Sequence, residues 1–152
     1  MQKLSDEHWM SIAFEEALKA QELGEVPVGA VIVNNDGIVA KAHNQPISKN
    51  DPTSHAEINA IRIAAKKLSN YRLSNCNLYV TLEPCAMCYG AIIHARISKL
   101  IFGAYDLKTG VCGSSINLHK KECFNHTPEI KGGVLEEDCS KILKDFFRDK
   151  RS

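Results

Sequence analysis

The sequence predicts a three-layer α/β/α fold with a central mixed sheet of about five strands. Residues 27–42 have the pattern of a β-hairpin, which forms an antiparallel strand pair. Residues 77–104 read as strand, helix and strand, an order that implies a parallel crossover. Three further segments, 6–23, 55–68 and 135–148, have helical periodicity and supply helices for both faces of the sheet.

The predicted hairpin consists of two extended segments joined by turn residues. Residues 27–33 are mainly apolar and β-branched, residues 34–37 are asparagine, asparagine, aspartate and glycine, and residues 38–42 resume an extended pattern. Asparagine, aspartate and glycine favour tight turns because they tolerate positive φ angles. The two strands are therefore expected to be antiparallel.

The predicted crossover comprises a strand at 77–81, a helix over 84–95 that begins with proline, and a strand at 99–104. Residues 105–127 contain glycines and polar residues with no sustained period, so no regular element is predicted there. Residues 128–134 are expected to add a short strand.

Each predicted helix carries apolar residues at helical spacing. Residues 6–23 end before a glycine, where a C-terminal cap belongs. Residues 55–68 follow a polar stretch, and Thr53 or Ser54 is the expected N-cap. Residues 135–148 place apolar side chains along one face. These helices are expected to pack on the sheet.

A chain of 152 residues with 44% hydrophobic and 24% charged residues can bury one sizeable core, so a single domain over residues 1–152 is expected. The net charge of +1 excludes a strong positive field over the whole protein but allows a local basic patch. No apolar stretch approaches the ~20 residues of a membrane span, and the N-terminal residues lack the apolar centre of a signal peptide. We therefore expect a cytoplasmic protein without a membrane segment.

The six cysteines allow three disulfides, but a chain of this length with an ordinary core has little need of them. Cys85 and Cys88 form a Cys-x-x-Cys pair, which indicates metal or redox chemistry instead. The other four lack paired spacing and are expected to be small buried hydrophobes or incidental thiols. They are Cys76, Cys112, Cys123 and Cys139.

His55, Cys85 and Cys88 are the candidate ligands of a zinc ion. A catalytic zinc usually takes three protein ligands and leaves one position for water. The candidates lie at predicted helix starts, where the helix dipole and the metal favour the thiolate. The Cys-x-x-Cys pair taken alone favours a structural zinc, a redox dithiol or two unrelated core cysteines.

Glu57 is the candidate acid–base residue. On a regular helix its side chain diverges from that of His55 by roughly 200°, so the two converge only beyond the helix tip. That arrangement suits a site in which His55 binds the metal and Glu57 stays off it. The Glu57 carboxylate is then free to take and return protons.

The pattern His-x-Glu followed by Pro-Cys-x-x-Cys is the known signature of zinc-dependent nucleobase deaminases. Here it reads His55-Ala56-Glu57 and Pro84-Cys85-Ala86-Met87-Cys88. Over nearly its whole length the chain resembles the family of bacterial tRNA-specific adenosine deaminases. The stretches that carry this resemblance are Glu25-Val26-Pro27-Val28-Gly29-Ala30, Asp51-Pro52-Thr53-Ser54-His55-Ala56-Glu57, Tyr79-Val80-Thr81-Leu82-Glu83-Pro84-Cys85 and Phe102-Gly103-Ala104.

The resemblance implies a cytidine-deaminase-type fold and hydrolytic deamination of adenosine to inosine at the wobble position of tRNA. It further implies one zinc ion per subunit, a homodimer, and the tRNA anticodon stem-loop as partner. Glu57 would pass protons from the attacking water to the ring nitrogen and the departing amine. Two alternatives stay open. One is a deaminase of a free base or nucleotide, such as guanine or a cytosine derivative, and the other is an RNA-binding module whose structural zinc has a fourth protein ligand.

The resemblance also implies how the base is held. Asn44 would hydrogen-bond the flipped base, and backbone amides near Cys85 and Ala86 would hold the attacking oxygen. From the residues alone, a role in capping or shaping its loop is favoured for Asn44. The apolar wall of the pocket is expected to consist of Val28, Leu82 and Pro84.

By the same resemblance, the anticodon loop contacts the segment 104–110 and the final helix. Aromatic and cationic side chains there can stack on and steer single-stranded RNA. Phe146 falls on the apolar stripe of the helix and is expected in the core, whereas Phe147 lies at its edge. The acidic start and basic end of this helix also simply complement its own dipole. The expected RNA contacts are Tyr105, Asp106, Lys108, Phe147 and Arg148.

Overall fold

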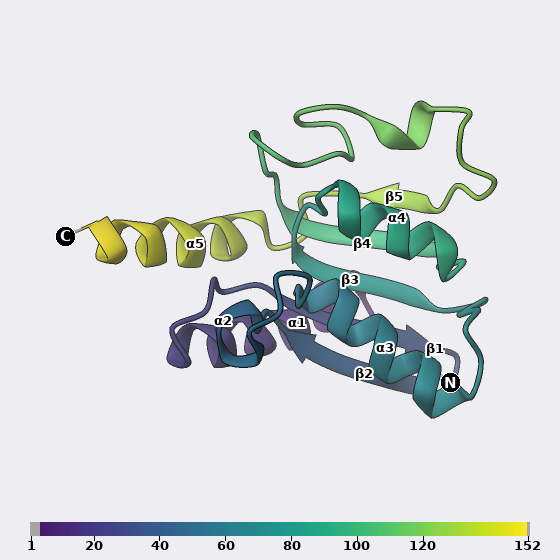
Figure 1. Cartoon of the computed structure of the whole chain (residues 1–152), viewed down its shortest axis with the longest axis horizontal. Helices are drawn as coiled ribbons and strands as arrows, with labels where there is room; N and C mark the ends of the chain where they lie inside the picture. Colours follow the sequence, from purple (N-terminus) through teal and green to yellow (C-terminus); the bar gives the residue numbers. More distant parts are fainter. Residues whose placement is uncertain (1–3, 152) are drawn as a thin grey trace.

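A five-stranded mixed sheet with helices on both faces forms the body of the protein (Figure 1). The computed structural model describes residues 4–151, so residues 1–3 and 152 of the expected domain lie outside the described residues. The strand order is β2-β1-β3-β4-β5, and the predicted three-layer α/β/α fold is confirmed. The strands are β1 (Gly29–Asn34), β2 (Gly37–His43), β3 (Asn77–Leu82), β4 (Lys99–Ala104) and β5 (Glu129–Lys131).

The sheet is mixed because its two halves are paired differently. β1 pairs antiparallel with both β2 and β3, whereas β3 pairs parallel with β4 and β4 pairs parallel with β5. The β1–β2 pair is the predicted hairpin, and its register shifts between Ile32 and Val33. The parallel β3–β4 pair confirms the predicted crossover. The carboxyl ends of β3 and β4 therefore meet at one edge of the sheet.

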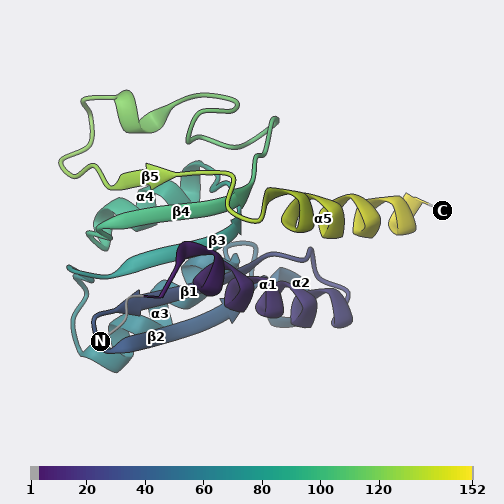
Figure 2. The same ribbon diagram turned by 180° about the vertical axis from the view of Figure 1, so that it is seen from behind.

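The longer helices cover the sheet on its two faces. α3 (Ala56–Leu68) and α4 (Ala86–His94) lie side by side on one face, and α1 (Asp6–Glu22) lies on the opposite face (Figures 1 and 2). α5 (Glu136–Arg151) contacts β3 and β4 and then projects beyond the sheet. None of the helices within residues 4–151 has both the length and the apolar character needed to cross a membrane.

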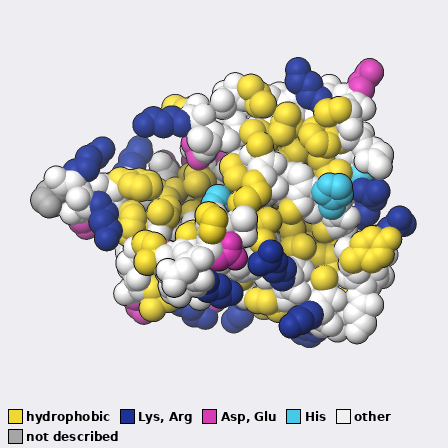
Figure 3. Space-filling view, in the orientation of Figure 1, with side chains coloured by type: hydrophobic (Ala, Val, Ile, Leu, Met, Phe, Trp, Pro, Cys, Tyr) yellow, Lys and Arg dark blue, Asp and Glu magenta, His cyan; other side chains and the backbone are white. Residues whose placement is uncertain are grey.

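The projecting α5 has a mixed surface. Hydrophobic side chains gather where it leaves the body, and Lys and Arg side chains flank them along the helix (Figure 3). Its buried residues are Cys139, Ile142 and Leu143, all in its first half. The second half of α5 has no buried residue and lies at the surface of the protein.

The start of α3 differs from the sequence-based prediction. His55 is the N-cap of this helix, so the predicted cap by Thr53 or Ser54 is wrong. Both hydroxyl groups donate to other side chains, those of Asp51 and Asn59. The first backbone N–H of α3 therefore donates to a different residue.

The start of α4 also differs. The helix begins at Ala86 with Cys85 as its N-cap, so Pro84 does not open it as predicted. Pro84 lies in the connection before the helix, where its carbonyl oxygen accepts a hydrogen bond of 3.1 Å from the Val111 N–H. Two of the metal-ligand candidates, His55 and Cys85, are therefore the N-caps of α3 and α4.

Two short elements are not predicted by the sequence. α2 (Pro46–Lys49) lies in the polar stretch before α3, and η1 (Leu118–Lys120) lies between β4 and β5. Each spans about one turn, which is too short to show a helical period. The final helix also continues three residues past its predicted end at residue 148.

α1 packs directly against β1 at Gly29. A Cβ atom added to Gly29 would lie 2.0 Å from the Ala13 carbonyl oxygen and 2.5 Å from the Ala17 amide nitrogen. These are backbone atoms of a helix, which cannot rotate aside as a side chain can. Ala13 and Ala17 are themselves fully buried. The spacing between this helix and the sheet therefore requires glycine in the strand.

Gly29→Ala is expected to lower the free energy of unfolding by about 1–3 kcal/mol, because overpacking forces the helix away from the strand. Chemical denaturation measures the change. Gly90→Ala is the matched control, since Gly90 lies within α4 and an added Cβ meets nothing within 4 Å. There alanine should raise stability by up to about 1 kcal/mol through its helix propensity. Wild-type stability of Gly29→Ala would contradict the packing argument.

Candidate active site

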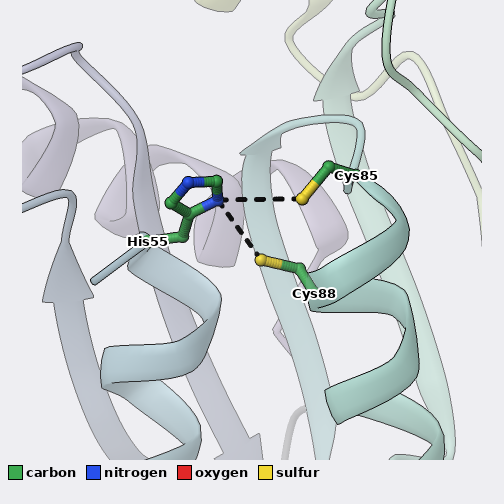
Figure 4. A group of neighbouring side chains, drawn as sticks. All are labelled: His55, Cys85 and Cys88. Atoms are coloured by element: carbon green, nitrogen blue, oxygen red, sulfur yellow. Dashed lines mark hydrogen bonds between the residues drawn. The ribbon is translucent and has the colours of Figure 1, made fainter. Parts of the chain in front are cut away.

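Three side chains converge where α3 and α4 begin. His55 Nδ1 lies 3.5 Å from Cys88 Sγ and 3.8 Å from Cys85 Sγ (Figure 4). All three ligand atoms lie within 4.8 Å of one another. The structure thus brings together the metal-ligand candidates of the sequence, although His55 and Cys85 are 30 residues apart along the chain.

The local backbone explains why these side chains are free to meet. His55 and Cys85 occupy the N-caps of α3 and α4 in extended conformations, and neither side chain caps its own helix. An ordinary N-cap side chain turns back to accept an amide hydrogen bond. Here the side chains point toward one another across the two helix starts, and Cys88 joins them from the first turn of α4. The positive ends of both helix dipoles favour thiolates at this point.

The electrostatics of the group suit a divalent cation. The hydrogen bond with the Cys88 thiol, assisted by His55, outweighs burial and lowers the pKa of Cys85 to about 4. The same contact and burial raise the pKa of Cys88. A bound cation favours loss of the remaining thiol proton, because thiolate is the form that binds metal. Within residues 4–151, no other His, Cys, Asp or Glu joins this group, so one imidazole and two thiols form the three-ligand set of a catalytic zinc.

Glu57 lies beside the three ligands without joining them. It is the second residue of α3 and its side chain is 4% exposed. Burial raises the pKa of its carboxyl group to about 7. Because His55 has an extended backbone, both side chains reach one cavity despite their two-residue separation. A carboxyl group poised near neutral pH can both accept and return a proton.

His55, Glu57 and Cys85 form part of the wall of a cavity of about 420 Å³. Its size is that of a small-ligand site. The segment after β4 and the projecting α5 supply other parts of the wall. The apolar residues among the remaining lining include Val26, Val28, Leu82, Leu143 and Phe147.

Comparison with known proteins identifies the family. The MafB19-like deaminase family model matches residues 4–151. A tRNA-specific adenosine deaminase of Haemophilus influenzae is 52% identical over 147 residues, covering 96% of this chain and 85% of that protein. A solved structure from a study of A-to-I editing by tRNA:A34 deaminases at the wobble position of transfer RNA has a TM-score of 0.87 and 42% identity, covering 90% of this chain and 99% of that chain. A guanine deaminase structure from Bacillus subtilis has a TM-score of 0.66 and 32% identity, covering 97% of this chain and 94% of that chain.

The chain belongs to the MafB19-like deaminase family. The resemblance to tRNA-specific adenosine deaminases, inferred from the motifs, is confirmed by the identity over nearly the whole chain. The cytidine-deaminase-type fold is confirmed as well. His55, Cys85 and Glu57 thus line the cavity of a deaminase fold, and the buried Cys88 lies beside them.

Asn44 has a structural task in this deaminase site. Its Oδ1 atom accepts a hydrogen bond of 2.7 Å from the Ala56 N–H, which caps α3 in place of the His55 side chain. Its Nδ2 group makes no hydrogen bond with any of residues 4–151, and Asn44 lines the cavity. The capping role favoured from the residues alone is therefore present, and the amide nitrogen is left for a ligand.

The other predicted base contacts divide into two pairs. Val28 and Leu82 line the cavity. Pro84 and Ala86 do not: Pro84 is buried and held by the Val111 N–H, and the side chain of Ala86 is exposed at the first position of α4. Pro84 is thus absent from the cavity lining, although its neighbours Glu83 and Cys85 belong to it.

Only some of the predicted RNA contacts after β4 lie at the cavity. Tyr105 and Asp106 line the cavity, whereas Lys108 does not. The Asp106 carboxylate accepts hydrogen bonds of 3.1 Å from the backbone N–H groups of Lys108 and Thr109. It therefore shapes its own loop.

On α5, Phe147 lines the cavity and is 47% exposed, whereas Phe146 is partly buried. The two rings meet edge to face with centroids 5.4 Å apart. Arg148 lies outside the cavity lining, and its guanidinium group forms an ion pair of 3.2 Å with Asp145. Phe147 is thus the aromatic side chain that α5 presents to the site.

Two buried carboxylates that bind segments of the cavity wall are not singled out by the sequence, although both stand in family-like stretches. They are Glu25, which is 1% exposed, and Glu83, which is 2% exposed. Glu25 accepts hydrogen bonds from the backbone N–H groups of Ile47 at 3.1 Å and Ser48 at 2.7 Å, and from the Ser48 hydroxyl. It thereby holds α2, whose Pro46 lines the cavity. No local spacing reveals this contact because its partners are 22 and 23 residues away.

Stability is expected to depend on pH through Glu25. Burial opposes its ionisation, but hydrogen bonds from Ser48 and Ile47 outweigh burial and lower the pKa of Glu25 below its ordinary value of 4.5. A lowered pKa stabilises the folded protein above the ordinary value, and this stabilisation is lost as the pH falls through the folded value. The free energy of unfolding should therefore drop below about pH 4.5, and less steeply in Glu25→Gln.

Denaturant unfolding over a series of pH values measures this dependence. Glu25→Gln should also be less stable than the wild type at pH 7 by about 1–3 kcal/mol, since an amide nitrogen faces a backbone donor. Glu15→Gln, an exposed position on α1, is the matched control and should follow the wild-type curve. Parallel curves for Glu25→Gln and the wild type would contradict the role assigned to Glu25.

Proposed function

We propose that this protein hydrolytically deaminates adenosine to inosine at the wobble position of tRNA, using one zinc ion per chain. The observation that carries the proposal is the convergence of His55, Cys85 and Cys88 beside the buried Glu57, at a cavity that His55, Glu57 and Cys85 line. That cavity occurs in a chain 52% identical to a tRNA-specific adenosine deaminase. The zinc deaminase chemistry and the substrate class thus have separate support.

His55, Cys85 and Cys88 are the residues that would hold zinc. When bound, zinc supplies a Lewis acid that makes water nucleophilic at neutral pH. Three protein ligands leave a coordination position open, whereas a structural zinc requires a fourth. The three-residue group found within residues 4–151 therefore favours an enzyme over an RNA-binding module with a structural zinc.

Glu57 moves the protons of the reaction. Water forms a bond to C6 of adenine, and Glu57 accepts one of its protons and delivers it to the ring nitrogen N1. The second water proton reaches the exocyclic amine by the same carboxylate, the C6–N6 bond breaks, and ammonia departs. Burial raises the pKa of Glu57, which favours return of the proton to the substrate. Adenosine and water thus give inosine and ammonia.

The remaining cavity residues hold a base taken out of its stack. The free Nδ2 group of Asn44 donates to an acceptor on the purine edge, and the apolar side chains of Val28 and Leu82 pack against the ring. The backbone N–H of Ala86, at the first position of α4, is one of the donors that a helix start leaves unpaired. We infer that it holds the attacking oxygen.

The surface around the cavity suits single-stranded RNA. Tyr105 and Phe147 line it while remaining 46% and 47% exposed, so their rings are open to stacking by bases next to the target. Lys and Arg side chains also lie along the projecting α5 (Figure 3). We infer that the anticodon stem-loop binds there, with Asp106, Lys108 and Arg148 near its backbone. A homodimer in the cytoplasm is likewise inferred from the family.

A deaminase of free guanine is the second candidate, favoured by the 32% identity to the Bacillus subtilis enzyme. The zinc ligands and Glu57 would serve both reactions. The higher identity to tRNA-specific adenosine deaminases favours the tRNA substrate. Substrate size separates the two candidates.

Zinc-loaded protein is expected to convert the wobble adenosine of an anticodon stem-loop RNA to inosine and to release one ammonia per inosine. Free adenosine, guanine and cytidine should react poorly, because they cannot use the aromatic contacts at the cavity mouth. Nuclease digestion and mass spectrometry measure inosine. Activity on free compounds alone would overturn the tRNA assignment.

Glu57→Ala is the control for the chemistry. It should lower turnover on the order of 10²–10⁴-fold while retaining the wild-type zinc content, because Glu57 moves protons but does not bind the metal. Cys88→Ser should lose both zinc and turnover. Loss of zinc from Glu57→Ala would instead place Glu57 among the ligands.

Two substitutions of Asn44 should separate its two roles. Asn44→Ala should lower the free energy of unfolding by about 0.5–2 kcal/mol, the cost of a lost helix cap, and should lower turnover as well. Asn44→Asp keeps an oxygen for the Ala56 N–H but removes the Nδ2 donor, so it should retain most of the stability and still lose turnover. Denaturation and the stem-loop assay measure the two effects. Wild-type turnover in Asn44→Asp would show that Nδ2 does not contact the base.

A further inference from the structure

Glu83 is a buried carboxylate whose hydrogen bonds all go to one loop. Its Oε1 atom accepts from the Asp106 N–H at 3.1 Å and from the Ser114 hydroxyl. Its Oε2 atom accepts from the Cys112 N–H at 2.8 Å and from the Ser114 N–H at 3.2 Å. These donors are 23 to 31 residues away, in the segment 106–114 that follows β4. The proton steps described above do not use this group.

Glu83 lies between a zinc-ligand candidate and the loop at the entrance of the cavity. Glu83 directly follows Leu82, the last residue of β3, and precedes the ligand Cys85 by two residues. The loop that it holds supplies Tyr105, Asp106, Leu107 and Thr109 to the cavity wall. One buried side chain thus connects the segment that carries Cys85 to the loop that follows β4.

Gly110 shows how tightly the loop wraps around this carboxylate. A Cβ atom added to Gly110 would lie 2.4 Å from Glu83 Cδ and 2.5 Å from the Asp106 carbonyl oxygen. The Gly110 N–H in turn donates to that carbonyl oxygen at 2.9 Å. Only a residue without a side chain fits between the carboxylate and the loop backbone, so the loop is held from both sides.

The side chains on this loop reach outward. Leu107 is 80% exposed and Tyr105 is 46% exposed, although both line the cavity. They therefore lie at the mouth, where a substrate extends beyond its reacting base. His55, Glu57 and Cys88 are instead positioned by α3 and α4. Displacing the loop is therefore expected to alter the contacts with the substrate more than the positions of His55, Glu57 and Cys88.

We propose that Glu83 is a positioning residue that sets the affinity for the nucleotides flanking the target adenosine, by holding the segment 105–114 as the outer wall of the cavity. It acts through backbone hydrogen bonds and does not touch the reacting atoms. The proposal rests on the proposed tRNA substrate. It assigns Glu83 an effect on substrate binding that is separate from the rate of deamination.

Glu83→Gln tests this with little change in side-chain size. Both carboxylate oxygens accept a hydrogen bond from a backbone N–H, so an amide nitrogen in either orientation faces at least one donor that cannot accept. One or two of the four contacts are lost, which loosens the loop. The KM for the anticodon stem-loop should rise on the order of tenfold, because substrate contacts depend steeply on position. At saturating RNA, kcat should stay within about twofold, and the zinc content should be unchanged.

Three further proteins complete the experiment. Glu16→Gln changes another buried carboxylate, 4% exposed on α1 and paired with Lys19 at 2.6 Å, and should leave KM unchanged. Ser114→Ala removes only the hydroxyl donor and should raise KM in the same direction by a smaller factor, even if Glu83→Gln folds poorly. In a Glu57→Ala background, where turnover is expected to be slow, Glu83→Gln should raise the Kd for fluorescently labelled stem-loop by the same factor as KM.

Several outcomes would overturn the proposal. An unchanged KM in both Glu83→Gln and Ser114→Ala would show that the loop does not govern substrate affinity. A loss of kcat with KM unchanged would assign Glu83 to the chemistry or to general stability. Failure of the wild-type protein to deaminate the stem-loop would instead contradict the proposed function itself, and is read from the wild-type arm alone.

Discussion

The meeting of two helix N-termini at one edge of the sheet is the constraint on which the rest of the site depends. Like ends of two helix dipoles repel, and negative charge between α3 and α4 offsets that repulsion. The Cys85 thiol, whose pKa is lowered, supplies this charge, and a bound divalent cation would favour ionisation of Cys88 as well. The same geometry therefore stabilises the helix starts and creates the metal site.

In this arrangement, residues outside the two helices hydrogen-bond to backbone N–H groups around the site. His55 cannot both bind a metal and cap α3, so Asn44 accepts the Ala56 N–H in its place. The loops around the cavity have no sheet partners for many of their N–H groups, and the buried carboxylates of Glu25 and Glu83 accept these instead. Buried polar groups that are fully paired hold their surroundings in one conformation. The cavity thus has rigid walls although much of it is built from loops.

Most of the architecture could be predicted because it is encoded in local patterns. The alternation and turn residues of 27–42 predict the hairpin, and the order of elements in 77–104 predicts the parallel crossover, both as observed. The two wrong helix starts have a common cause. Thr53 and Pro84 have the propensities of a cap and a first helical residue, but tertiary contacts use them differently. Propensity is a weak guide where a distant residue competes for the same group.

The sequence by itself determined the fold class, the three ligand candidates and Glu57, because their spacing within short motifs ties them to helix starts. It did not separate Val28 and Leu82, which line the cavity, from Pro84, which does not. Nor did it reveal Glu25 and Glu83 as organisers of the cavity walls. Only the tertiary structure decided these points, because their partners lie 22 or more residues away and spacing along a chain carries no information about contacts between elements that the fold brings together.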